Sequence, residues 1–197
     1  MKKAFGILFL IFTSLLIVGC SANGTAEDNG AEAEETVDKS EQAIRAVIEK
    51  EFNGPDEKYK ALWEAMAEAQ TSVKYSDDYE AFLESPEYQG LMSYMEETYA
   101  SYFTENGYDN FINSTPAFHY SNRDQDYELN TSNIEIAQSE NGTTLYDFTF
   151  QVEYTGENGE SEQFNFKGKA IAPEEGKIGK IEFLDQGGLL QELRNNE

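Results

Sequence analysis

The chain has 197 residues and a formal net charge of −24, from 38 acidic and 14 basic residues. A surface this acidic is repelled by nucleic acid and by anionic lipid head groups, so nucleic-acid binding is excluded and membrane attachment needs another source. The single cysteine excludes internal disulfides as a source of stability.

The first 20 residues, MKKAFGILFLIFTSLLIVGC, combine a short basic start with an apolar run that ends at Cys20. Lys2 and Lys3 form the basic start. The run over 4–18 would span roughly 22 Å as a helix, less than the ~30 Å hydrocarbon core of a bilayer. The pattern is typical of a secretory signal peptide rather than of a transmembrane helix. We therefore expect residues 1–19 to be removed.

A secretory signal needs no cysteine, yet the stretch LIVGC places Cys20 directly after the apolar run. This stretch resembles the lipobox of bacterial lipoproteins. The resemblance implies that a diacylglyceryl group is joined to Cys20 through its sulfur and that Cys20 becomes the first residue of the mature chain. It also implies that the protein is held at the cell membrane, on the extracytoplasmic face. Because one acyl chain binds a membrane only marginally, two or more would make the anchor stable.

The 20 residues after Cys20 are mostly small or acidic and include no aromatic side chain. This composition is typical of a disordered spacer. We therefore expect 20–40 to be a lipidated, acidic tether. Residues 41–197 are numerous enough to form a single globular domain with its own core.

Apolar residues at helical spacing predict three helices near the start of this domain. The first covers 40–52 with Ser40 as its N-cap, the second covers 56–70, and the third covers 85–107 and ends at Gly107. Residues 77–84 are expected to add one or two helical turns. The apolar side chains of the first helix are Ala43, Ile44, Val47, Ile48 and Phe52.

After Gly107 the apolar period changes to two residues, which is typical of strands. Strands are predicted over the ranges 126–138, 143–154, 162–171 and 177–184, with a short closing helix over 188–194. The Asn-Gly pairs at 141–142 and 158–159 predict hairpins. In the first strand the apolar phase shifts between Leu129 and Ile134, which indicates a bulge or an irregular break.

This order predicts an α+β fold in which N-terminal helices pack on a curved antiparallel meander of four to five strands. It resembles the nuclear-transport-factor-like and cystatin-like domains, in which a bent sheet wraps a long helix. Most aromatic side chains of the sheet are expected to form the core. The mouth of the curved sheet is expected to leave an aromatic-lined cavity for an apolar or ring-shaped ligand. The candidate ligand-binding residues are Tyr146, Phe148, Phe150, Tyr154, Phe164, Phe166 and His119.

His119, the only histidine, lies near Asp124 and Asp126 and could do acid–base work or hold Ser121 as a nucleophile. At strand spacing its neighbours point the opposite way, so we expect a surface or rim position. The sequence contains no nucleophile elbow, zinc-ligand spacing or phosphate-cradling loop. We therefore predict no catalytic residue, metal or cofactor.

The expected function is that of a membrane-anchored envelope lipoprotein. Its acidic, non-enzymatic domain would bind a small molecule, a peptide or another envelope protein. The alternative is a small envelope enzyme with a site in the sheet cavity near His119.

Overall fold

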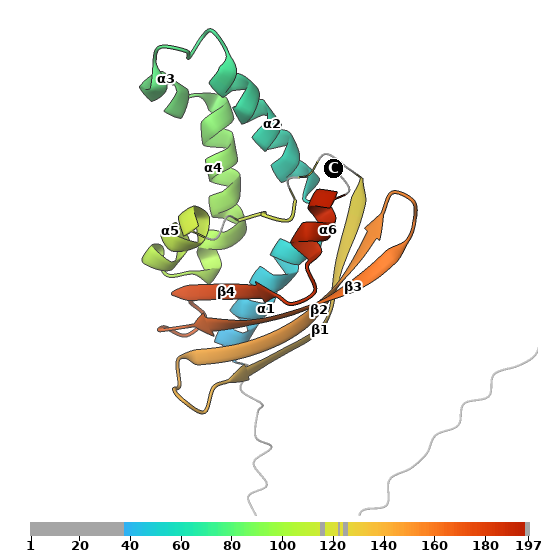
Figure 1. Ribbon diagram of the computed structural model, residues 1–197. Coiled ribbons are helices and arrows are strands. Elements are labelled where there is room, and N and C mark those ends of the chain that lie inside the picture. The colour runs from blue at the N-terminus through green and yellow to red at the C-terminus, as the bar shows by residue number, and fades with distance from the viewer. Residues whose placement is uncertain (1–37, 115–116, 122, 124–125, 196–197) are drawn as a thin grey trace, which may run out of the picture. The chain divides into compact units, whose positions relative to one another are not determined.

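The computed structural model describes residues 38–114, 117–121, 123 and 126–195. The predicted signal peptide, Cys20 and most of the predicted tether lie outside these residues. Within them the chain forms six α-helices and a four-stranded antiparallel sheet, with five of the helices before the sheet, which confirms the α+β class (Figure 1). No helix in the described part of the chain is long and apolar enough to cross a bilayer.

The first helix, α1 (Lys39–Phe52), begins earlier than predicted because Asp38 is its N-cap. The Asp38 carboxylate accepts hydrogen bonds from the backbone N–H groups of Ser40 and Glu41. A carboxylate at this position also interacts with the positive end of the helix dipole. Ser40, the predicted cap, is buried and accepts a hydrogen bond from Gly176 N instead. The predicted domain boundary at residue 41 therefore falls inside α1.

Helix α2 (Glu57–Thr71) follows, capped by Asp56, and leads through the short α3 (Tyr79–Leu83) to α4 (Pro86–Tyr99), capped by Ser85. Helices α2 and α4 pack against each other (Figure 1).

The prediction of one helix that ends at Gly107 is wrong. A short 3-10 turn, η1 (Ala100–Tyr102), ends α4, and a separate helix α5 (Glu105–Ser114) contains Gly107. A Cβ atom at Gly107 would lie 2.3 Å from the carbonyl oxygen of Ile178. The glycine therefore permits a close approach between α5 and the chain that leads into the last strand.

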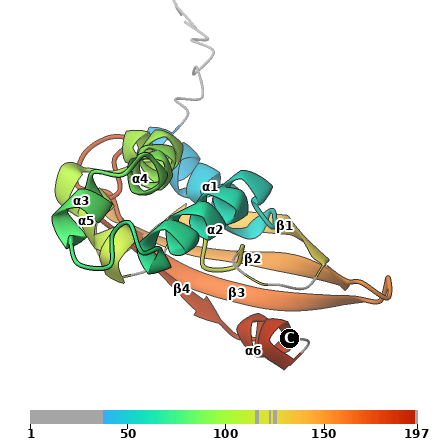
Figure 2. The same ribbon diagram turned by 90° about the horizontal axis from the view of Figure 1, so that it is seen from above.

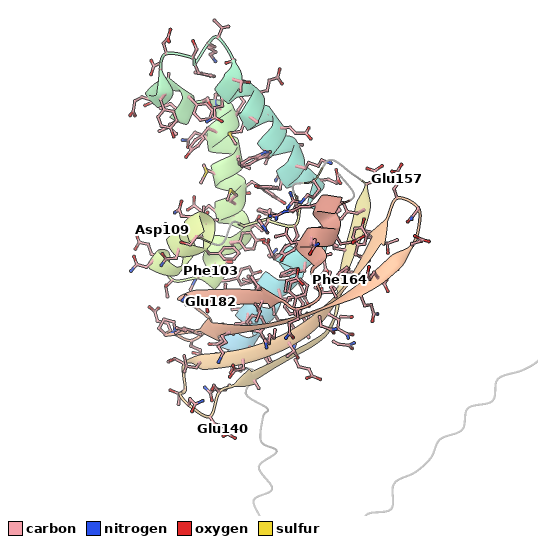
Figure 3. The ribbon with its side chains drawn as sticks, in the orientation of Figure 1. Phe103, Asp109, Glu140, Glu157, Phe164 and Glu182 are labelled. Carbon is pink, nitrogen blue, oxygen red and sulfur yellow. The ribbon has the colours of Figure 1, made fainter. Side chains whose placement is uncertain are left out.

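The sheet is a meander of β1 (Tyr127–Gln138), β2 (Leu145–Gly156), β3 (Ser161–Ile171) and β4 (Lys180–Asp185), in that order. The closing helix α6 (Leu189–Asn195) follows β4. The predicted bulge is confirmed: the register between β1 and β2 shifts between Ser132 and Glu135, and Asn133 adopts a left-handed conformation there. Figure 3 shows Glu140 in the β1–β2 hairpin and Glu157 in the β2–β3 hairpin, at opposite ends of the sheet.

The core lies between α1 and the sheet, and Phe52 is at its centre. The Phe52 ring lies 4.7 to 5.1 Å from the rings of Tyr120, Phe150, Phe166 and Phe183. Even-numbered residues of β2 are buried in this core from position 146 to position 154. The helices lie on one side of the sheet, so no element of the described part of the chain covers the other face (Figures 1 and 2).

The outer edge of β1 is closed by the end of α1. Gly54 forms a backbone bridge with Leu129, and Asn53 Oδ1 accepts a hydrogen bond of 2.7 Å from Thr131 N. Further along the strand, Arg45 donates to the carbonyl oxygen of Ile134 at 3.2 Å. These contacts use backbone groups that would otherwise be free to pair with another strand.

Candidate functional site

The uncovered face of the sheet carries a hollow of about 740 Å³ that crosses all four strands. We call it the open-face hollow. Two cross-strand rows form its walls: the first is Glu135, Thr149, Lys167 and Leu184, and the second is Ala137, Asp147, Lys169 and Glu182. All eight residues are exposed and stand on the face away from the helices.

Between the walls runs a third row, Ile136, Phe148, Gly168 and Phe183. Because successive side chains of a strand point to opposite faces, the side chains of this third row lie on the helix side of the sheet. The backbone of the row therefore forms the floor of the hollow. Gly168 is needed in this row because a Cβ atom there would lie 2.3 Å from the Phe148 ring and 2.2 Å from the Glu182 carbonyl oxygen. The Phe148 ring thus occupies the space that a side chain at Gly168 would need.

The register gives the hollow its dimensions. Its walls stand two residues apart along each strand, about 7 Å, and four neighbouring strands span about 14 Å. The volume falls in the range of ordinary ligand sites, roughly 300–1,000 Å³. An extended chain or a flat ring system would fit such a space.

The walls of the hollow carry both signs of charge on an otherwise acidic molecule. Lys167 and Lys169 stand on opposite walls, and Lys169 forms an ion pair of 3.2 Å with Asp147. Leu184 adds an apolar side chain that is 54% exposed. This mixture suits a ligand with an apolar body and polar groups of either charge.

The sequence-predicted aromatic residues are not gathered in one place around a cavity. Phe150, Phe164 and Phe166 are buried in the core, and the rings of Phe150 and Phe166 stack at 4.9 Å. Phe148 borders the open-face hollow, although it is largely buried beneath it.

Tyr146 and Tyr154 are also buried, near opposite ends of β2. Tyr146 donates a hydrogen bond to Asp38 and borders a small hollow of about 180 Å³. Tyr154 borders a larger hollow of about 970 Å³ near the β2–β3 hairpin, where the other lining residues include Asp126, Glu157, Glu160, Glu162 and Glu192.

His119 lies in a turn over 117–121, so the strand spacing from which its surface or rim position was predicted does not apply to it. It is half-buried beside Tyr120, whose ring lies 5.3 Å from its own. Burial, with smaller contributions from Arg123 and Arg194, lowers the pKa of His119. Ser121 accepts a hydrogen bond from Asp56 N at 3.0 Å, and among the described residues no hydrogen bond joins it to His119.

The most perturbed carboxyl in the described part of the chain is Glu51, which lies near the C-terminal end of α1 and is only 3% exposed. Burial raises its pKa from the ordinary 4.5 to about 7, against the lowering effect of its hydrogen bonds. Those bonds come from Phe118 N, the Tyr99 hydroxyl and His119 N, at 2.8 to 2.9 Å.

Sequence reasoning missed both Glu51 and the hollow. Glu51 follows Ile44 by seven residues and Val47 by four, so it stands on the apolar stripe of α1, and this spacing is a usable signal. The open-face hollow carries no comparable signal, because its walls join residues from four strands through their register.

Comparisons with known proteins add no assignment. No family model matches the chain, and no curated protein or solved structure matches it at a significant level. The resemblance to nuclear-transport-factor-like and cystatin-like domains therefore stays a prediction.

Proposed function

We propose that this chain is a lipid-anchored protein of the bacterial envelope that presents a non-enzymatic binding domain, with the open-face hollow as its binding surface. The stretch LIVGC at residues 16–20 supports the anchor. The observation that carries the binding role is the open-face hollow itself: an uncovered sheet face with apolar surface between two charged walls.

The lining favours an extended peptide segment as the ligand. A strand-like segment of about four residues spans about 14 Å, the width of the four-stranded sheet. Lys167 and Lys169 would pair with carboxylates of the peptide, and Glu135 and Glu182 with its basic groups. The floor and Leu184 would cover an apolar side chain.

Binding is preferred to catalysis because of the surroundings of His119. Its ring packs against Tyr120, and the nearby Ser121 hydroxyl is held by Asp56 N. A nucleophile needs a base within hydrogen-bond reach. The enzyme alternative is tested by His119→Ala, which would abolish an activity without unfolding the domain.

The binding role is tested by thermal unfolding of the full chain with a panel of short peptides and apolar small molecules. Wild type is compared with Lys167→Glu and Leu184→Asp, which change the walls of the hollow without touching the core. Val73→Asp is the matched control, because Val73 is 92% exposed on the loop between α2 and α3.

We expect some panel members to raise the Tm of wild type and of Val73→Asp, and to lose that effect in both wall variants. Equal Tm shifts in all four proteins would place binding elsewhere and refute the hollow. The absence of any shift across the panel would favour a spacer without a ligand.

A further inference from the structure

The Glu51 carboxyl joins α1 to a segment 67 positions later in the sequence. Its Oε2 accepts hydrogen bonds from Phe118 N at 2.8 Å and from the Tyr99 hydroxyl at 2.9 Å. Its Oε1 accepts from His119 N at 2.8 Å. The three donors are uncharged, so an ionised Glu51 would be a buried charge without a cationic partner among them.

The segment that Glu51 holds, residues 117–121, is strained. Phe118 has a φ of 60°, a left-handed conformation that is unfavourable for a bulky residue. Its ring stacks at 4.3 Å on Tyr59 and at 5.6 Å on Tyr94, and meets Tyr99 edge-on at 5.1 Å. Phe118 therefore closes an aromatic cluster built from α2 and α4.

We propose that residues 117–121 form a pH-responsive strap, which the protonated Glu51 carboxyl holds against this aromatic cluster and which loosens as that carboxyl ionises. The reason is desolvation: a buried carboxylate with only neutral partners is costly, and opening of the strap returns it to water. The strain at Phe118 favours the same opening. Loosening exposes the rings of Tyr59, Tyr94 and Tyr99, which Phe118 covers in the closed state.

The direction follows from the two pKa values of Glu51. Closure raises the pKa to about 7, whereas a hydrated carboxyl has its ordinary value of 4.5. A raised pKa means that the closed state binds the proton more tightly. The extra stability of closure is therefore fully present below the ordinary pKa and is lost as pH rises from 4.5 to about 7.

Other titratable groups surround the strap and do not produce this trend. Burial raises the pKa of each nearby tyrosine, which keeps it neutral over this range. The lowered pKa of His119 stabilises the closed state more as pH rises, which is the opposite direction. The titratable and charged groups around Glu51 and the strap are Asp56 and Tyr59 at α2, Tyr94 and Tyr99 of α4, His119 and Tyr120 of the strap, Arg123, Asp185 of β4, and Arg194 of α6.

Hydrogen exchange of the full chain between pH 5 and 8 tests the strap. Protection factors, which correct for the intrinsic pH dependence of exchange, are measured for peptides covering 117–121, with peptides covering 148–154 of β2 as the internal control. In wild type we expect strap protection to fall about tenfold per pH unit and to level off near pH 7, because one pKa unit corresponds to a tenfold change. Protection of β2 should stay constant.

Two variants identify the titrating group. Glu51→Gln cannot ionise, so its strap protection should no longer fall as pH rises; only the opposite, rising contribution of His119 remains. Tyr99→Phe removes a hydrogen bond that lowers the pKa of Glu51, so protection should level off at a higher pH than in wild type. A wild-type strap whose protection does not fall with pH, or a fall that persists in Glu51→Gln, would overturn the proposal.

Discussion

At the scale of single residues, Gly168 determines how the floor of the open-face hollow is built. Phe148 crosses it on the helix side, and the Glu182 carbonyl oxygen approaches it from β4. Neither a ring in the core nor a backbone carbonyl can move aside cheaply. A single methyl group at this position would therefore push β2 and β4 away from β3.

We predict that Gly168→Ala lowers the free energy of unfolding by about 1–3 kcal/mol, the usual cost of overpacking a core. Gly142→Ala is the matched control, because its Cβ would lie 3.4 Å from Leu145, an ordinary contact. It should change stability by about 0.5 kcal/mol or less. Urea unfolding measures both. Equal stability of the two variants would show that the sheet accommodates a side chain at Gly168.

Single residues were also the hardest to predict from sequence. The helical spacing of α1 is visible, but a glutamate on its stripe becomes meaningful only when Phe118 and Tyr99 are seen to donate to it. Gly107 is a reasonable helix terminator by composition. Its actual role depends on the backbone of residue 178, more than 70 positions later, which packs so closely against it that a Cβ atom would not fit.

At the scale of elements, α1 connects the helices to the sheet. Its last residue, Phe52, contacts aromatic rings from β2, β3, β4 and the strap. The neighbouring Asn53 and Gly54 then close the edge of β1. The C-terminal end of α1 thus contacts both the inner face of the sheet and the outer edge of β1.

Removal of the Phe52 ring should be among the most costly truncations in the chain. We predict that Phe52→Ala lowers the free energy of unfolding by about 3–5 kcal/mol through lost burial and the cavity it leaves. Tyr79→Ala, at a position that is 64% exposed, should cost less than about 1 kcal/mol. Thermal or urea unfolding compares the two variants, and a small loss in Phe52→Ala would mean that the sheet holds together without α1.

The elements themselves were largely predictable. Alternation in β2, both hairpins and the bulge in β1 follow from local pattern, and the structure confirms them. Helix α5 was missed because its ten residues include only three that are large and apolar or aromatic, and because Gly107 suggested an end. The open-face hollow depends on which residues pair across four strands, and local pattern does not determine that pairing.

At the scale of the whole molecule, 38 acidic residues face only 14 basic ones. The hollow near the β2–β3 hairpin alone is lined by five carboxylate residues. With a net charge of −24, the folded chain repels itself more than the expanded chain does. Screening should therefore stabilise the fold.

We predict that the urea midpoint rises when ionic strength increases from about 0.01 M to about 0.1 M, as the Debye length falls from ~30 Å to ~10 Å. The double variant Glu157→Lys and Glu162→Lys, both at exposed positions, should show a smaller rise because it begins with less repulsion. An identical rise in the variant and in wild type would point to an effect of salt other than screening of this charge.

The acidity of the whole molecule also bears on its attachment to a membrane. A chain of this charge is not held to anionic lipid by electrostatics. The anchor that we propose is the lipid on Cys20, and the proposed envelope location depends on it.

The most direct test is the intact mass and membrane partition of the chain expressed in a bacterium, with wild type beside Cys20→Ala. The account predicts that wild type begins at Cys20, carries the mass of two or three acyl chains and sediments with membranes, whereas the variant carries no lipid. A wild-type chain with an unmodified Cys20 thiol, soluble or uncleaved, would contradict the lipoprotein proposal and the envelope location that follows from it.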